Sequence, residues 1–224
     1  GHASGPPEPG LFDAADAVIH LAGEPVSGRW TREKRLRIRD SRGAGTRRVV
    51  EAMGAAAPRP RTLISASAIG WYGDRGDAIL DEGASPGEGF LAEVCADWEA
   101  AAAEAADADT RVIHLRIGIV LGAGGGALTA MLPPARAGLG GPMGSGRQWW
   151  SWIHVDDVVG LILHGLAHPT LRGPVNATAP EPVQQRDLAR ALGATLGRPA
   201  MLPAPAFALR AMVGGFASEL LSSR

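Results

Sequence analysis

The sequence is poor in three residue types that carry chemistry or covalent cross-links. Its 224 residues include one cysteine, Cys95, one lysine, Lys34, and one tyrosine, Tyr72. A single cysteine excludes an internal disulfide and fits a reducing compartment, so we expect a cytoplasmic protein. On a helix with an apolar face, Cys95 is expected to pack as a small hydrophobic residue rather than to act as a nucleophile.

Long apolar runs and an excess of charge are also missing. No apolar run reaches the roughly 18 residues of a transmembrane helix, and no basic-then-apolar leader opens the chain. The formal net charge of -1 gives no general attraction to polyanions. We therefore expect neither a nucleic-acid nor a membrane partner. Because the chain starts Gly-His-Ala without an initiating methionine, we expect a fragment or a processed or tagged product.

What the chain does contain is typical of a globular protein. Hydrophobic residues make up 46% and charged residues 20%. The length allows one large domain, or one domain with a small lobe. The basic charge is almost all arginine within an Ala-, Gly- and Pro-rich composition, so the number of arginines alone is weak evidence for anion binding.

Strand and helix patterns alternate along the chain. Short apolar runs predict strands at 17–22, 62–67, 111–121, 148–155 and 175–177. Helical spacing of apolar residues predicts helices at 31–55, 89–105, 127–137, 156–168, 185–196 and 206–221, with Asp156 and Asp157 capping the fourth. The alternation favours right-handed βαβ units and therefore an α/β fold with a mostly parallel sheet.

The strand at 62–67 runs on into hydroxyls, small residues and two aromatic residues before Asp74. In an open α/β sheet, ligands bind beyond the carboxyl ends of the strands, because loop backbone and helix N-termini converge there. We therefore expect any chemistry to be centred on the end of this strand.

Glycine-rich segments offer two candidate sites. The segment from Gly122 to Ala127 fits the spacing of a dinucleotide fingerprint, but no acid that could hold a ribose lies between Asp109 and Asp156, so a tight loop is favoured. The second segment, Gly144-Ser-Gly-Arg147, could hold a phosphate or carboxylate through backbone N–H groups and the guanidinium. A solvated loop is the alternative there, and both readings remain open.

Three tryptophans follow that second loop. On a strand, Trp150 and Trp152 would point to one side and Trp149 to the other, so at least one is expected in the core and the pair could floor a pocket. The histidines are scattered, and the pair His164 and His168 has no third ligand nearby. We therefore expect no metal site.

Several segments, in order, resemble the atypical, epimerase-like branch of the extended short-chain dehydrogenase/reductases. They are His20-Leu-Ala-Gly-Glu-Pro25, Asp40-Ser-Arg42, Ser65-Ala-Ser-Ala-Ile-Gly-Trp-Tyr-Gly73, Phe90-Leu-Ala-Glu with Trp98-Glu99, Leu115-Arg-Ile-Gly-Ile-Val-Leu-Gly122, Gly138-Leu-Gly-Gly-Pro, Gly144-Ser-Gly-Arg147 and Trp152-Ile-His-Val-Asp-Asp157. The resemblance covers nearly all of residues 17–221. It is to epimerase/dehydratase-like proteins of unknown substrate.

The resemblance implies a Rossmann-type domain with a doubly wound, mostly parallel sheet that binds NAD or NADP, and a small C-terminal lobe on the substrate side. By this reading, residues 13–135 and 148–168 form an incomplete NAD(P)-binding domain, and residues 136–147 and 169–224 form the lobe. Members of the family begin with a strand, a glycine-rich turn and a helix that are not present before residue 17. The preference for NAD or NADP therefore cannot be read, and a chain of these residues alone should bind cofactor weakly.

A second departure concerns the catalytic pair. Dehydrogenases of this superfamily use a Tyr-x-x-x-Lys helix face, in which the tyrosine is the general acid or base. That pair cannot exist here, because Lys34 and Tyr72 are far apart and in the wrong order. If Glu99 is aligned with the acid that often follows the pair, Leu91 and Cys95 take the two catalytic places.

The resemblance assigns the catalytic serine to Ser67. Tyr72 could stand in as a proton donor, with a packing role as the alternative. The anionic part of a substrate would lie at Arg147, with Trp150 in the pocket wall. Cofactor contacts are assigned to Leu21, Ala22, Gly23, Arg37, Arg42, Ser65 and Val120.

Two functions fit these expectations. The first is an NAD(P)-binding, epimerase-like oxidoreductase in which Ser67 polarises a carbonyl or hydroxyl of a small, anionic substrate held by Arg147. The second is a dinucleotide-binding sensor or interaction protein with little or no turnover. Dimerisation through helices is common in the superfamily, so a homodimer is the assembly to test.

Overall fold

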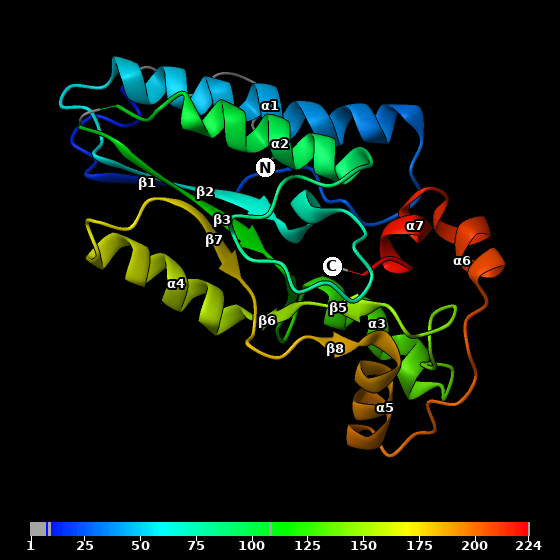
Figure 1. Ribbon diagram of the computed structural model, residues 1–224. Coiled ribbons are helices and arrows are strands. Elements are labelled where there is room, and N and C mark those ends of the chain that lie inside the picture. The colour runs from blue at the N-terminus through cyan, green and yellow to red at the C-terminus, as the bar shows by residue number, and fades with distance from the viewer. Residues whose placement is uncertain (1–7, 9, 108, 224) are drawn as a thin grey trace.

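The computed structural model describes residue 8 and residues 10–107 and 109–223. Its centre is a four-stranded parallel sheet in the order β1-β2-β3-β7, formed by β1 (Ala17–His20), β2 (Thr62–Ala68), β3 (Arg111–Ile117) and β7 (Gly173–Ala177) (Figure 1). Near-continuous apolar runs form these strands because a parallel sheet is covered on both faces. The predicted α/β class with a mostly parallel sheet is confirmed.

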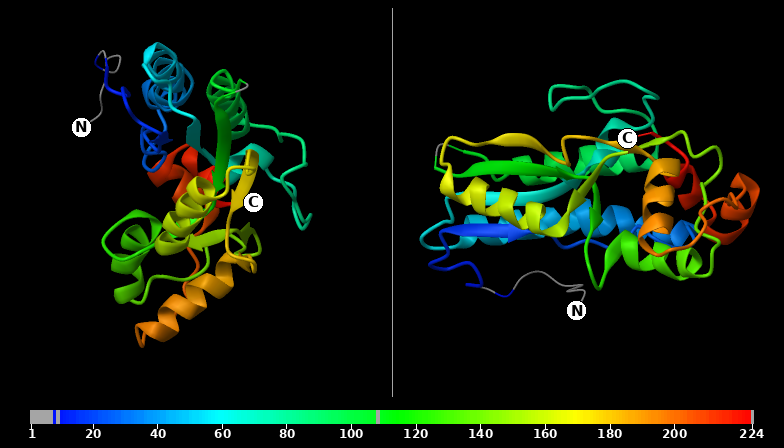
Figure 2. Two further views of the ribbon diagram at one scale, coloured as in Figure 1. Left: turned by 90° about the vertical axis from the view of Figure 1, so that its left-hand side faces the viewer. Right: turned by 90° about the horizontal axis from the view of Figure 1, so that it is seen from below.

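Helices cover both faces of this sheet. α1 (Arg32–Ala55) and α2 (Phe90–Ala103) lie side by side on one face, and α4 (Val155–Ala167) lies on the other (Figures 1 and 2). Each face has its own buried cluster. One contains Val18, Met53, Leu63, Ala102 and Val112, and the other contains Ile64, Ile113, Leu115, Ile153 and Ile162. The alternation of Leu63 with Ile64 and of Val112 with Ile113 therefore divides each strand between two cores.

Two predicted strands are interrupted. The strand predicted at 111–121 is divided at Gly118 into β3 and β4 (Ile119–Leu121). A Cβ atom at Gly118 would lie 2.6 Å from the Ser151 carbonyl oxygen, so only glycine allows these backbones to approach here. The strand predicted at 148–155 is also divided, into β5 (Trp149–Trp150), which pairs antiparallel with β8 (Val183–Gln184), and β6 (Trp152–His154), which pairs parallel with β4.

Four helices gather beyond the carboxyl ends of the main strands (Figure 1). They are α3 (Gly126–Arg136), α5 (Gln185–Thr195), α6 (Ala206–Val213) and α7 (Phe216–Leu220). The single helix predicted at 206–221 is wrong, because Gly214 adopts a φ of 58° and ends α6. The short helix η1 (Ile69–Tyr72) continues directly from β2 at the same end of the sheet.

Two further predictions need correction. Residues 169–224 were assigned to the lobe, but β7 pairs with β3 and so belongs to the main sheet; the rest of the division into two lobes stays a prediction. The cap of α4 is His154, whose Nδ1 accepts from the Asp156 N–H at 3.2 Å, and not an aspartate. Within the described residues, no helix is both long and apolar enough to cross a membrane.

Candidate active site

A buried polar cluster lies at the carboxyl ends of β2 and β3. The parallel register places Ser67 opposite Arg116, and α2 brings Glu99 against both. Ser67 Oγ donates to Glu99 Oε1 at 2.7 Å. The Arg116 guanidinium donates twice to the same carboxylate, from Nε to Oε1 and from Nη2 to Oε2, each at 2.9 Å. This is a bidentate arginine–carboxylate pair, the geometry in which such pairs are strongest.

Tyr72 joins the same cluster from η1. Arg116 Nη1 donates to Tyr72 Oη at 3.0 Å, and Tyr72 Oη donates to Asn176 Oδ1 at 2.6 Å. The guanidinium also stacks on Trp71, at 4.0 Å from the ring centre. Of the two hydroxyls predicted to be catalytic, that of Tyr72 therefore bonds to Arg116 directly, and that of Ser67 bonds to the Glu99 carboxylate that pairs with Arg116. We call Ser67, Tyr72, Glu99, Arg116 and Asn176 the Arg116 network.

The network is largely removed from water. Ser67, Tyr72, Arg116 and Glu99 are 2%, 3%, 3% and 8% exposed. Burial by itself lowers the pKa of Arg116, but its hydrogen bonds with Glu99 and Tyr72 outweigh this and raise the pKa above its usual value. Arg116 therefore keeps a fixed positive charge beside two hydroxyls.

His114 lies two residues before Arg116 on the same strand and so faces the same side of the sheet. It is 8% exposed, and its Nδ1 has no hydrogen-bond partner within the described part of the chain. Burial lowers the pKa of His114; the charge of Glu99 acts against this shift and that of Arg116 adds to it. The imidazole is therefore neutral at pH 7.

Ser67 is not free to bind a ligand in this arrangement. Its hydroxyl proton is donated to Glu99, and the residue is buried. To donate to a substrate oxygen, the hydroxyl would have to leave the carboxylate. The catalytic role of Ser67 therefore stays a prediction, and so does that of Tyr72.

A cavity of about 690 Å³ adjoins Tyr72, and we call it the Tyr72 cavity. One side is the loop that follows η1, and the other is the segment that follows β7. Its lining includes Tyr72, Arg75, Asp77, Ile79, Trp149, Ser151, Asn176, Thr178, Pro180, Glu181 and Pro182. Sequence reasoning placed a site at the end of β2 but missed Asn176 and Thr178, because only the pairing of β7 with β3 brings them there.

Three of the predicted cofactor contacts, Leu21, Ala22 and Gly23, follow β1 directly, and we call them the strip after β1. Leu21 is 51% exposed, and Ala22 is also exposed. Arg42 on α1 reaches this strip, where its Nη1 donates to the Glu24 carbonyl oxygen at 3.0 Å. A Cβ atom on Gly23 would lie 3.3 Å from the Arg42 guanidinium carbon, so the missing side chain leaves room for the arginine. An exposed apolar edge with a cation beside it fits a dinucleotide.

Arg42 is also in contact with α2. Its guanidinium lies 4.9 Å from the centre of the Trp98 ring. Burial lowers the pKa of Arg42, and its electrostatic interactions with Cys95 and Glu24 act in the opposite direction. Arg42 therefore bridges the strip after β1 and the face of α2 that carries Trp98.

The other predicted cofactor residues are arranged differently. Arg37 is exposed, and its Nε lies 3.4 Å from Glu24 Oε1. Ser65 is fully buried and donates to the Ala66 carbonyl oxygen, so its hydroxyl does not reach the strip. Val120 is partly buried against the cluster under α4.

The structure does not bring Arg147 and Trp150 together with Tyr72 in one cavity. Arg147 is exposed, and its side chain makes no hydrogen bond or ion pair with the described residues. Trp150 is 4% exposed and packs in the interior. Trp149 instead lines the Tyr72 cavity, with its Nε1 donating to Asp77 Oδ1 at 2.6 Å.

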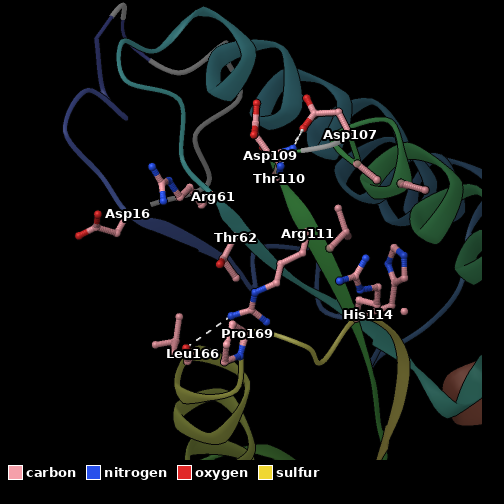
Figure 3. A pocket seen from close by; sticks show the side chains of 15 residues that line it. Asp16, Arg61, Thr62, Asp107, Asp109, Thr110, Arg111, His114, Leu166 and Pro169 are labelled. Atoms are coloured by element: carbon pink, nitrogen blue, oxygen red, sulfur yellow. Dashed lines mark hydrogen bonds between the residues drawn. The ribbon is translucent and has the colours of Figure 1, made fainter.

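A second cavity, of about 670 Å³, opens at the amino ends of the main strands (Figure 3). Arg111 points across it and donates to the Gly165 and Leu171 carbonyl oxygens at 2.8 and 2.9 Å, so it caps the end of α4. Asp107 Oδ1 accepts a hydrogen bond from the Thr110 N–H at 2.7 Å. Arg111 and Asp107 thus bind the protein's own backbone, and we assign no ligand to this cavity. The described residues contain no cluster of three or more metal-ligating side chains.

Comparison with known proteins identifies relatives along the whole chain. Residues 10–177 match the NAD dependent epimerase/dehydratase family. The chain is 45% identical over 210 residues to the chloroplastic SDR39U1 homolog of Arabidopsis thaliana, an epimerase family protein. The aligned region covers 93% of this chain and 60% of that protein. It is 42% identical over 219 residues to the epimerase family protein MT2273 of Mycobacterium tuberculosis. That alignment covers 95% of this chain and 72% of the relative.

A solved structure agrees with the fold. The crystal structure of human epimerase family protein SDR39U1 with NADPH superposes with a TM-score of 0.90 at 34% identity, over 100% of this chain and 75% of that one. The chain spans about three fifths of the length of the Arabidopsis relative. That relative is described as chloroplastic, and the cytoplasmic location of this chain stays a prediction.

Proposed function

The chain belongs to the NAD dependent epimerase/dehydratase family, and from this premise we propose that it is an NAD(P)-dependent, epimerase-like oxidoreductase of a small molecule. The observation that carries the proposal is the Arg116 network. It places the Tyr72 hydroxyl on a buried cation, and the Ser67 hydroxyl on the carboxylate paired with that cation, at the carboxyl end of β2 and beside a cavity of about 690 Å³. Ligands of open α/β sheets bind at this end.

The cofactor would lie along the strip after β1. Leu21, Ala22 and Gly23 offer exposed backbone and apolar surface, and Arg42 offers a cation beside them. The human relative was crystallised with NADPH, which supports a dinucleotide cofactor. When bound, the nicotinamide supplies hydride transfer. NAD and NADP both remain candidates for this chain.

Within the network, Tyr72 is the group that would move a proton. Its Oη carries a proton toward Asn176 Oδ1 and accepts a hydrogen bond from Arg116. A substrate oxygen that takes the place of Asn176 Oδ1 would receive that proton, and Arg116 would stabilise the charge that develops. Ser67 would hold Glu99, and through it Arg116, in position.

The alternative function is a dinucleotide-binding sensor or interaction protein. It is favoured by the absence of a Tyr-x-x-x-Lys pair from the sequence, with Leu91 and Cys95 of α2 in its two places if Glu99 is aligned with the acid that often follows the pair. It is also favoured by the hydroxyls of Ser67 and Tyr72, which both already donate to acceptors within the protein.

Titration with NADH and NADPH, followed by fluorescence, separates these functions. It should be done on the 224-residue chain and on the polypeptide extended to the length of its relatives. A panel of small carbonyl compounds and nucleotide sugars then tests hydride transfer. The variant Arg147→Ala, assayed on the same panel, tests the prediction that Arg147 holds an anionic group of the substrate. Binding with turnover supports the enzyme, and binding without turnover on any substrate supports the sensor. No binding by the extended protein would contradict both.

A further inference from the structure

The loop between η1 and α2 lies beside the Arg116 network, and its residue Glu82 bonds to two members of that network. We call residues 74–86 the Glu82 loop. We propose that this loop is a lid that withholds the Tyr72 proton while it is closed, and that Glu82 is the positioning residue that keeps it closed. The proposal assigns a regulation to the proposed function and rests on it.

The two ends of the loop are held close together. The Gly87 N–H donates to the Trp71 carbonyl oxygen at 2.8 Å. A Cβ atom on Gly87 would overlap the Tyr72 carbonyl oxygen. One on Gly73 would lie 2.9 Å from the Glu88 amide nitrogen, and Gly73 has a φ of 64°. Glycine is therefore required at both ends. A surface loop whose ends are joined in this way is an Ω-loop, a class that frequently carries function.

The loop holds both hydrogen-bond partners of the Tyr72 hydroxyl, which are Asn176 and Arg116. The Asn176 N–H donates to Glu82 Oε1 at 2.8 Å, and Arg116 Nη1 donates to the Glu82 carbonyl oxygen at 3.1 Å. Asn176 Nδ2 donates to the Leu80 carbonyl oxygen over a longer distance, 3.4 Å. The Glu82 carboxylate thus ties the loop to β7, and the Leu80 carbonyl oxygen orients the Asn176 amide.

With the loop closed, the Tyr72 proton has an acceptor inside the protein. Tyr72 Oη donates to Asn176 Oδ1 at 2.6 Å, and Tyr72 is 3% exposed. A substrate oxygen can receive this proton only after Asn176 Oδ1 has moved away. The backbone of Asn176 pairs with β3, so the side-chain amide has to turn. Opening the loop removes the Leu80 carbonyl oxygen and frees that turn. The amide can then donate from Nδ2 to Tyr72 Oη, which leaves the phenol proton for the substrate.

Little buried surface opposes the opening of the loop. None of residues 74–86 is buried, Ile79 is 100% exposed, and the loop stands out from the rest of the protein (Figure 2). Its other contacts include the bond from Trp149 Nε1 to Asp77 Oδ1, at 2.6 Å. Segments that are held by exposed hydrogen bonds with little apolar packing are those that open locally. Because Ile79 and Asp77 line the Tyr72 cavity, opening also widens access to it.

A fluorescent label reads the position of the loop without cofactor or substrate. The only cysteine of the sequence, Cys95, is 3% exposed, so Ile79→Cys offers one accessible thiol for a bimane label. Trp149 should quench the label while the loop is closed, and Trp149→Phe gives the unquenched reference. In this background Glu82→Ala should brighten the label several-fold, because the loop loses its bond to the Asn176 N–H.

Two variants are matched controls for the label. Glu82→Gln keeps a side-chain oxygen that accepts from the Asn176 N–H, so the label should stay quenched. Glu88→Ala removes an exposed acid outside the loop and should also leave the label quenched. Equal quenching in Glu82→Ala and in the parent chain would overturn the proposal.

Tyr72 has to respond if the loop controls it. Because the chain has one tyrosine, labelling with ¹³C-tyrosine gives a single ring signal in NMR. That signal should shift in Glu82→Ala and keep its parent position in Glu82→Gln and Glu88→Ala. Release of the bimane label without a change at Tyr72 would show that the loop and the tyrosine are independent, and would overturn the proposal.

Turnover separates regulation from a merely structural role. On the panel of substrates above, Glu82→Ala should raise kcat several-fold while the affinity for NADPH stays the same, since the substrate no longer has to displace a closed loop. An equal or lower kcat in this variant would overturn the proposal. Absence of turnover in every variant would contradict the proposed function, and the bimane and tyrosine signals would still decide whether the loop and Tyr72 are coupled.

Discussion

Ser67 Oγ and Glu99 Oε1 lie 2.7 Å apart, and the same carboxylate oxygen accepts from Arg116 Nε at 2.9 Å. The serine thus adds a third hydrogen bond to the Glu99 carboxylate of a buried ion pair. Its hydroxyl is in place before any ligand arrives, so its first effect is on the stability and the position of Arg116.

This relationship predicts a clear ranking of two variants. Glu99→Ala should lower the free energy of unfolding by about 3–5 kcal/mol, because it leaves the Arg116 charge buried and unpaired. Ser67→Ala should cost only about 1.5–3 kcal/mol, because the bidentate pair survives the loss of one hydrogen bond to a charged group. Urea unfolding measures both. In the double variant Glu99→Ala/Arg116→Met, part of the loss should be recovered; equal losses for the two single variants would contradict the ranking.

The variant Tyr72→Phe tests whether the single tyrosine of the sequence donates a proton or only packs. The ring and its contacts remain, but the hydroxyl between Arg116 and Asn176 is lost. If Tyr72 moves a proton, the rate of hydride transfer should fall by about 100- to 10,000-fold while the affinity for NADPH stays the same. Stopped-flow fluorescence of NADPH follows both quantities. A variant that turns over normally would leave Tyr72 with a packing role.

Arg42 and Arg37 offer a matched pair on α1 for testing the cofactor strip. Arg42→Met should weaken NADPH binding by about tenfold or more, because the guanidinium lies against Gly23 and Trp98 with part of its charge shielded from water. Arg37→Met should have a smaller effect that disappears in high salt, since Arg37 is exposed. Fluorescence titration gives the two affinities, and an unfolding curve checks that Arg42→Met is folded. A larger effect at Arg37 would show that the strip is wrongly placed.

The fold was accessible from the sequence because apolar runs and helical spacing alternate so regularly. What could not be foreseen were the interruptions. Gly118 bends a continuous apolar run because the Ser151 backbone approaches it, and nothing next to Gly118 in the sequence signals this. The four-residue helix η1 likewise depends on Gly87, whose missing side chain lets the returning loop pass the Tyr72 carbonyl oxygen.

The site was predicted in part. The end of β2 was identified from its hydroxyls, and Ser67 and Tyr72 do lie in one network. Arg116 and Glu99 both lie in segments that carry the family resemblance, but the sequence assigned neither to the site. Their pairing depends on the register of β2 with β3 and on the rotation of α2, which are properties of the tertiary structure.

Buried histidines make the stability depend on pH. Burial lowers the pKa of both His20 and His114 from an ordinary value of 6.5. As the pH falls through about 6.5, the unfolded chain takes up protons that the folded chain does not, so the free energy of unfolding should decrease. Chemical unfolding between pH 7.5 and 5.5 should show this slope, and His114→Gln should flatten it. Glu24 and Asp107, whose pKa values are lowered, act in the same direction but only at more acidic pH. An unchanged slope in His114→Gln would mean that the loss comes from other groups.

The uncovered side of α4 predicts that the 224-residue chain self-associates. Val155, Val159, Leu163 and Leu166 are spaced along one face of this helix and are exposed. On the neighbouring edge strand β1, Ile19 is also exposed, in register with Ile64, which packs in the cluster under α4. Apolar side chains that gather in this way favour association.

Analytical ultracentrifugation over a range of protein concentrations should therefore show dimers or larger species. Val159→Glu/Leu163→Glu should shift the protein toward monomer without lowering the free energy of unfolding, because both side chains already face water. Met212→Glu, on the exposed surface of α6, is the matched control and should leave the association unchanged. If the α4 variant associates as strongly as the parent chain, contact between copies is made elsewhere. The edge of β1 that pairs with no strand of the described residues would be the next surface to alter.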